Sequence, residues 1–111
     1  MREAAATPMP AEAAWERDSG GGLLLCGDWR LRPLDQLLRR DAASLLRQRW
    51  EYLSFAKVTA LDSATLAFVL DWQSAQRALG SQAELRAPPR TLLDLAKLYG
   101  LTQLWQENIH A

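Results

Sequence analysis

The stretch that most constrains the fold is residues 58–70, where a short loop leads without a break into a strongly apolar helix. Asp62 and Ser63 stand at the start of that helix. Their side-chain oxygens suit the free N–H groups of a first helical turn. A helix that begins there also presents the positive end of its dipole. The functional interpretation below therefore centres on this junction.

Strand-like and helix-like segments alternate along the rest of the chain. Short β-rich or apolar runs predict strands at 15–17, 23–26, 50–55 and 82–86. The glycines of segment 18–22 predict a tight turn between the first two strands. Apolar residues at helical spacing predict helices at 34–49 (opened by Pro33), 63–79 and 91–99, and a last helical turn or two over 101–109. Strands that alternate with helices indicate an α/β layer in which part of the sheet is parallel.

Length and composition narrow the class of protein. The 111 residues are enough for one domain, and the Ala-, Glu- and Pro-rich segment 1–13 is expected to be a disordered N-terminal tail. Lys and Arg number 13 and so do Asp and Glu, whereas phosphate recognition requires a basic excess, so nucleic acid is not an expected ligand. No signal-peptide core and no apolar run of ~20 residues occurs, which predicts a cytoplasmic protein without direct membrane insertion.

The sequence contains no recognisable catalytic or metal-binding motif. There is no Gly-rich phosphate loop and no Cys/His set with metal-ligand spacing, and the single histidine, His110, is the penultimate residue. The single cysteine, Cys26, lies in an apolar run and is expected to be a small buried residue. We therefore expect no catalytic residue, no metal and no cofactor.

The first two turns of the helix after Ser63 are apolar nearly all round. Leu66, Val69 and Leu70 fall on the arc that carries polar residues in the second half of the helix. A helix that is apolar all round is either completely buried or covers its outer face with a partner. The pattern alone leaves both interpretations open.

Three segments carry a resemblance to a known family. The ten residues from Val58 to Ala67, VTALDSATLA, resemble the characteristic loop and helix start of STAS domains. The run LLLCGD at 23–28 is similar to the second strand of that family, and LAKLYGL at 95–101 is similar to the third helix of its MlaB-type members. The resemblance spans about residues 15–105.

The resemblance implies a single STAS domain over 14–109, with a small mixed sheet of four to five strands and helices packed mainly on one side. It also implies a non-catalytic accessory subunit of the Mla phospholipid-transport ABC system, which maintains lipid asymmetry of the Gram-negative outer membrane. Such a subunit binds an MlaF-like ATPase, and through it a permease complex, and so lies peripheral to the inner membrane. The expected partner-binding residues are Asp62, Ser63, Ala64, Thr65, Leu66, Val69 and Leu70.

A second function remains open for the same residues. Ser63 falls where the STAS-domain antagonists of anti-sigma factors carry their phosphorylatable serine, which implies a partner-switching regulator controlled by phosphorylation of Ser63. The family usually has glycine at one or both positions after this hydroxyl, whereas this chain has Ala64 and Thr65. The partner must accommodate two small side chains there, or the geometry of the contact differs.

Overall fold

The computed structural model describes residues 12–101 and 109–110. Five strands and three helices alternate along this part of the chain. Their bounds are Ala13–Arg17 (β1), Leu23–Asp28 (β2), Leu31–Leu46 (α1), Tyr52–Ala60 (β3), Ser63–Ala78 (α2), Glu84–Arg86 (β4), Arg90–Leu98 (α3) and Ile109–His110 (β5).

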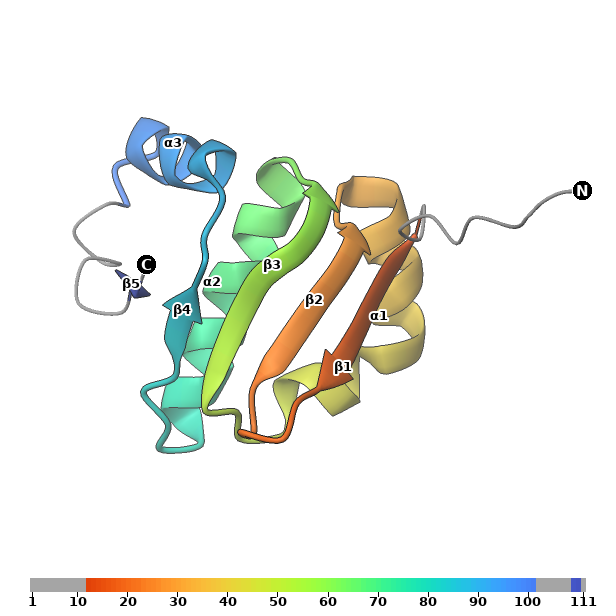
Figure 1. The fold of residues 1–111 in the computed structure, drawn as a ribbon, viewed down its shortest axis with the longest axis vertical. Helices are drawn as coiled ribbons and strands as arrows, with labels where there is room; N and C mark the ends of the chain where they lie inside the picture. Colours follow the sequence, from red (N-terminus) through yellow and green to blue (C-terminus); the bar gives the residue numbers. More distant parts are fainter. Residues whose placement is uncertain (1–11, 102–108, 111) are drawn as a thin grey trace, which may run out of the picture.

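The strands form one sheet in the order β1–β2–β3–β4–β5. β1 is antiparallel to β2, and all other neighbours are parallel. Each connection therefore advances by one strand in the same direction, and right-handed crossovers of this kind place their helices on one face of a sheet. Figure 1 shows α1 and α2 behind the sheet and α3 near the end at which β2 and β3 finish. The predicted mixed sheet with helices mainly on one side is confirmed.

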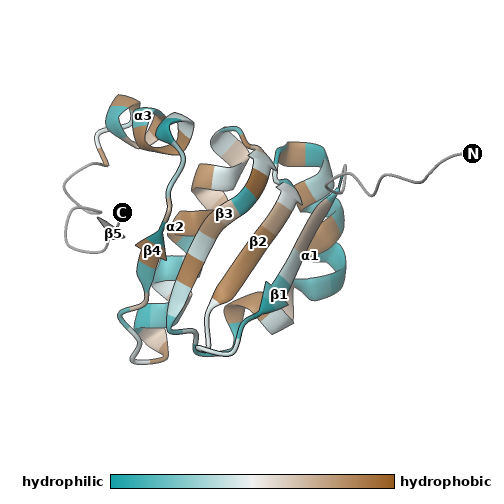
Figure 2. Ribbon diagram, in the orientation of Figure 1, coloured by the Kyte–Doolittle hydropathy of each residue, from teal (hydrophilic) through white to brown (hydrophobic). Residues whose placement is uncertain are grey.

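The core lies between the sheet and its helices. Figure 2 shows hydrophobic residues dominating β2 and recurring along β3, as expected for interior strands. Trp29, Trp50 and Trp72 are completely buried, and the ring of Trp15 meets that of Trp50 edge-on at 5.8 Å between centroids. Helix α2 is the middle helix and contacts both α1 and α3, so a wide arc of its surface is covered.

The turn between β1 and β2 follows the glycine-based prediction. The carboxylate of Asp18 accepts the N–H groups of Gly20 and Gly22 at 2.9 and 2.8 Å, and Gly21 adopts a positive φ of 84°. Gly22 also lies directly against the ring of Tyr52, because a Cβ at Gly22 would stand 2.0 Å from Cε1 of that ring. The glycines thus serve both the turn and the packing of β3.

Several element bounds differ from the sequence prediction. β3 runs on through 56–60, which was expected to be a loop, because it stays paired with β2 across two irregularities in register. β2 likewise includes Gly27 and Asp28, and β1 includes Ala13, which was assigned to the tail. The helix expected over 101–109 is wrong at its end, since Ile109 pairs with β4 as a strand. Most of the predicted tail (1–11) and most of the predicted last helix (102–108) lie outside the described residues.

Candidate functional site

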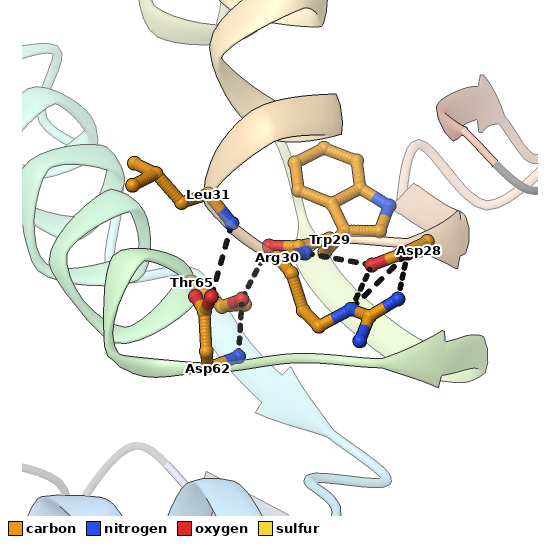
Figure 3. Close-up of polar contacts among 6 residues, drawn as sticks. All are labelled: Asp28, Trp29, Arg30, Leu31, Asp62 and Thr65. Carbon is orange, nitrogen blue, oxygen red and sulfur yellow. Dashed lines mark hydrogen bonds and ion pairs between the residues drawn. The ribbon is translucent and has the colours of Figure 1, made fainter.

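The candidate site lies where the parallel strands β2 and β3 end and the helices α1 and α2 begin. Parallel strands bring their carboxyl ends to one edge of a sheet, so the two strand-to-helix junctions meet. The junctions are short, with two residues between β2 and α1 and two between β3 and α2. Figure 3 shows how the residues of the two junctions are joined by hydrogen bonds.

Asp62 binds the first turns of both helices. Its Oδ1 accepts the N–H of Ala64 at 2.9 Å, and its Oδ2 accepts the N–H of Leu31, the first residue of α1, at 3.1 Å. A carboxylate satisfies free N–H groups and complements the positive end of a helix dipole. α1 has no cap from the side chain of its own preceding residue, Arg30, so Asp62 supplies one from the other junction. This single side chain therefore fixes the two helix ends relative to each other.

Thr65 completes the cap from inside the protein. Its hydroxyl accepts the N–H of Asp62 at 3.2 Å, which makes Asp62 and Thr65 a reciprocal capping box. The same hydroxyl donates to the carbonyl of Trp29 at 2.5 Å, and Thr65 is 0% exposed. Thr65 is thus a buried link between α2 and the β2–α1 junction and does not present a second hydroxyl to a partner.

Trp29 is a buried residue that connects the two junctions to the core. Its backbone N–H donates to the carbonyl of Ala60 and its indole Nε1 donates to the carbonyl of Cys26, each at 2.9 Å. Its ring packs against Phe68 of α2 at 5.3 Å between centroids. These contacts join the ends of β2 and β3 to the buried face of α2, so they fix the position of the helix start relative to the sheet.

Asp28 and Arg30 form an ion pair in the junction between β2 and α1. Two nitrogens of the Arg30 guanidinium and its backbone N–H all donate to the Asp28 carboxylate, the shortest at 2.7 Å. The side-chain hydrogen bonds from Arg30 lower the pKa of Asp28, and its partial desolvation opposes this less strongly. In turn, Asp28 raises the pKa of the Arg30 guanidinium. The cation is therefore held beside the strand end.

Ser63 brings a hydroxyl group to the exposed surface of the junction. It is exposed and is the first residue of α2, whereas Asp62 is the N-cap. The possibility that Ser63 itself caps the helix is therefore wrong. Within residues 12–101 its hydroxyl has no hydrogen-bond partner, so it is free for a contact or a modification.

The predicted partner-binding residues divide into a surface set and a buried set. Asp62 and Ala64, the chain neighbours of Ser63, are half-buried, and so is Leu70 further along α2. Leu66 at 3% and Val69 at 0% exposure belong to the core, so the expectation that they face a partner is wrong. The reason is the central place of α2, because α1 and α3 cover both of its flanks. The first turns are apolar all round chiefly because most of that circumference is buried.

Two hollows are lined in part by residues of the two junctions. One is an apolar groove of about 230 Å³ between α1 and α2, which includes Ala64 in its wall. The other, of about 300 Å³, lies over the end of β3 and the start of α3 and includes Arg30, Thr59 and Thr91. Sequence reasoning missed Leu31, which borders the groove and is 65% exposed. It is a single apolar residue off the buried stripe of α1, so no periodic pattern in the sequence marks it.

The described residues show no arrangement for metal binding. Between 12 and 101, no group of three or more His, Cys, Asp or Glu side chains is placed to hold a metal ion. None of the helices in this part of the chain is long and apolar enough to cross a membrane. The geometry of the site is that of an exposed hydroxyl on a rigid helix end with an apolar groove beside it.

Comparison with known proteins places this geometry in a family. A family model described as "Mlab, STAS domain" matches residues 14–106. Two solved structures share the fold: the anti-sigma factor antagonist SpoIIAA in its unphosphorylated form, and the Bacillus cell fate determinant SpoIIAA in its phosphorylated form. The first has a TM-score of 0.61 at 14% identity and covers 88% of this chain and 85% of its own. The second has a TM-score of 0.60 at 14% identity and covers 88% of each chain. No curated protein sequence matches. Because the family model spans most of the sequence, the chain belongs to the STAS-domain family, in the branch that the MlaB model describes.

Proposed function

We propose that this protein is a non-catalytic accessory subunit that binds and supports the ATPase of an ABC phospholipid transporter. That transporter would maintain the lipid asymmetry of the Gram-negative outer membrane, and the protein would sit on the cytoplasmic side of the inner membrane through its partner. The family match over residues 14–106 supports the assignment. The observation that carries it is the free hydroxyl of Ser63, held on a rigid helix end beside an apolar groove.

The construction of the junction supports binding. Asp62, Thr65 and Trp29 are all engaged in bonds inside the protein, so their polar atoms are used to set the position of the helix end. A contact on a preorganised surface loses little conformational entropy when it forms. A partner that binds the folded domain also stabilises it by mass action. By the same linkage, the bound domain would stabilise the folded ATPase.

Affinity purification from detergent-solubilised membranes tests the assignment. The tagged full chain is expected to bring down an ABC ATPase and, through it, a permease. A tagged Ser63→Arg chain serves as the matched control, because Ser63 is exposed and the substitution leaves the caps intact. Recovery of a kinase or a sigma-regulatory protein in place of the ATPase would overturn the proposal.

A partner-switching regulator is the second candidate. The exposed, unpartnered hydroxyl of Ser63 favours it, and SpoIIAA, which shares the fold, has been solved with and without phosphate. A phosphate on Ser63 would add about −1.5 to −2 charge at the start of α2, where the helix dipole favours it. The fold would therefore survive while the contact surface gained negative charge. Intact-mass measurement of protein purified from cells distinguishes the candidates, because Ser63 unmodified in every growth condition would contradict phosphorylation control.

A further inference from the structure

We infer that the groove between α1 and α2 receives an apolar side chain of the ATPase subunit that is flanked by Lys or Arg. This inference rests on the proposed function and specifies which part of the domain reads the partner. Its basis is the size of the groove, its exposed apolar rim, the charges on its banks and its continuity with Ser63.

The groove has the size and lining of a side-chain pocket. Its floor and walls are mainly aliphatic and aromatic, with Leu34, Leu38, Leu46 and Phe68 among the lining residues. Its volume of about 230 Å³ is below the roughly 300–1,000 Å³ of small-molecule sites. One or two partner side chains therefore fit the groove better than a phospholipid does.

The rim leaves apolar surface exposed to water. Leu31 is 65% exposed although it is a large aliphatic residue. Figure 3 shows its side chain pointing away from the ring of Trp29, which is itself in the core. Ala64 and Ala67 line the opposite wall, and their small side chains keep the groove open at that point. An inserted apolar group would bury Leu31 together with this wall.

The charges on the two banks are both negative. Asp35 lies on α1 and Asp71 on α2, and no Lys or Arg lines the groove. Asp35 shares its charge with Arg39 in an exposed pair at 3.1 Å. Among the described residues, Asp71 forms no ion pair. An incoming cation would therefore meet the carboxylate of Asp71, with the Arg39-paired Asp35 on the opposite bank, whereas an anionic headgroup or an acidic peptide would not be attracted.

The groove is continuous with the contact surface around Ser63. Ala64, which lines the groove, directly follows Ser63 in the first turn of α2. Leu31 at the rim is bonded through its backbone N–H to Asp62. The bond holds the rim of the groove and the serine in a fixed relative position, so one partner surface can engage both.

Binding of the purified ATPase subunit from the same transporter tests the inference. Asp71→Lys and Leu31→Gln should each weaken binding at least tenfold at low salt, and Asp71→Lys should also flatten the salt dependence. Glu51→Lys is the matched charge control, since Glu51 is exposed at the opposite end of β3. Circular dichroism and thermal melting of every variant establish that the domain remains folded.

The outcomes separate this inference from the proposed function. Loss of binding with Ser63→Arg but not with the two groove variants would overturn the groove inference and leave the proposed function standing. A wild-type chain that does not bind the ATPase would overturn both. A wild-type dimer that Leu31→Gln disperses would assign the groove to a second copy of this chain and would also overturn the inference.

Discussion

Replacing Thr65 by valine tests the polar link beneath the candidate site. Valine keeps the shape of threonine but removes the hydroxyl that accepts from Asp62 N–H and donates to Trp29 carbonyl. A buried polar group left without its partner costs about 1–3 kcal/mol. The Asp62 N–H is only partly buried and can form a hydrogen bond to water instead. Most of the cost therefore comes from the buried carbonyl of Trp29, which loses its donor. We expect a loss of about 2–3 kcal/mol in unfolding free energy, which corresponds to a fall of about 10–20 °C in Tm.

Urea unfolding followed by tryptophan fluorescence measures this change, with the slope of the transition checked for constancy. Thr65→Ser keeps the hydroxyl and loses one methyl group, so it should cost about 1 kcal/mol or less. Ser63→Ala changes an exposed residue without a bond and should stay within about 0.5 kcal/mol of wild type. A Thr65→Val protein as stable as Thr65→Ser would refute the argument that this hydroxyl holds the junction together.

Three other perturbations follow from the same structure. Gln76→Leu removes the amide that accepts from Trp50 N–H at 2.9 Å and donates to a backbone carbonyl at 2.7 Å, so it should cost about 2–4 kcal/mol in urea unfolding. Gly22→Ala forces a methyl group into the aromatic ring packed on it and should cost about 1–3 kcal/mol, read as a lower Tm. The pKa of Asp28 is lower in the folded state, because Arg30 donates to its carboxylate. Its stabilisation is therefore complete above the ordinary aspartate value of about 3.9 and is lost as pH falls through the folded pKa, so Asp28→Asn should flatten the acid limb of stability below about pH 4.

Matched variants keep these predictions specific. Gln73 lies on the same helix and is also buried, but has no hydrogen-bond partner within residues 12–101, so Gln73→Leu should be nearly neutral. A Cβ at Gly20 would stand at an ordinary 3.4 Å from Tyr52 Oη, so Gly20→Ala should be tolerated. Equal losses within either pair, or an unchanged acid limb in Asp28→Asn, would contradict the reasoning.

The alternation of strands and helices could be predicted from the sequence, because its signals are local. The glycine turn at 18–22 and the apolar run of β2 act over a few residues and are found where they were expected. The end of β3 could not be predicted, since the residues at 56–60 form a strand only through pairing with β2. β5 likewise exists through its pairing with β4, a contact between segments far apart in sequence.

The candidate site could be predicted only in part, for a similar reason. Asp62 and Ser63 were identified because helix starts have a characteristic composition. The sequence did not show which of these two side chains turns toward the protein. Asp62 does so partly because it accepts the N–H of Leu31, 31 residues earlier in the chain. Leu66 and Val69 were assigned to the surface because the spacing of apolar residues describes one helix at a time. Their burial comes from the two neighbouring helices, α1 and α3. Leu31 was missed because a single exposed leucine has no periodic signal.

Co-purification of the ATPase with Ser63→Arg tests the central claim most directly. The substitution places a bulky cation on an exposed residue at the start of α2, and leaves the bonds of Asp62 and Thr65 in place. We predict that the variant melts within a few degrees of the wild type, about the shift expected for a surface substitution, and no longer retains the ATPase. Undiminished recovery of the ATPase with a folded Ser63→Arg chain would contradict the assignment of this helix end as the partner-binding surface.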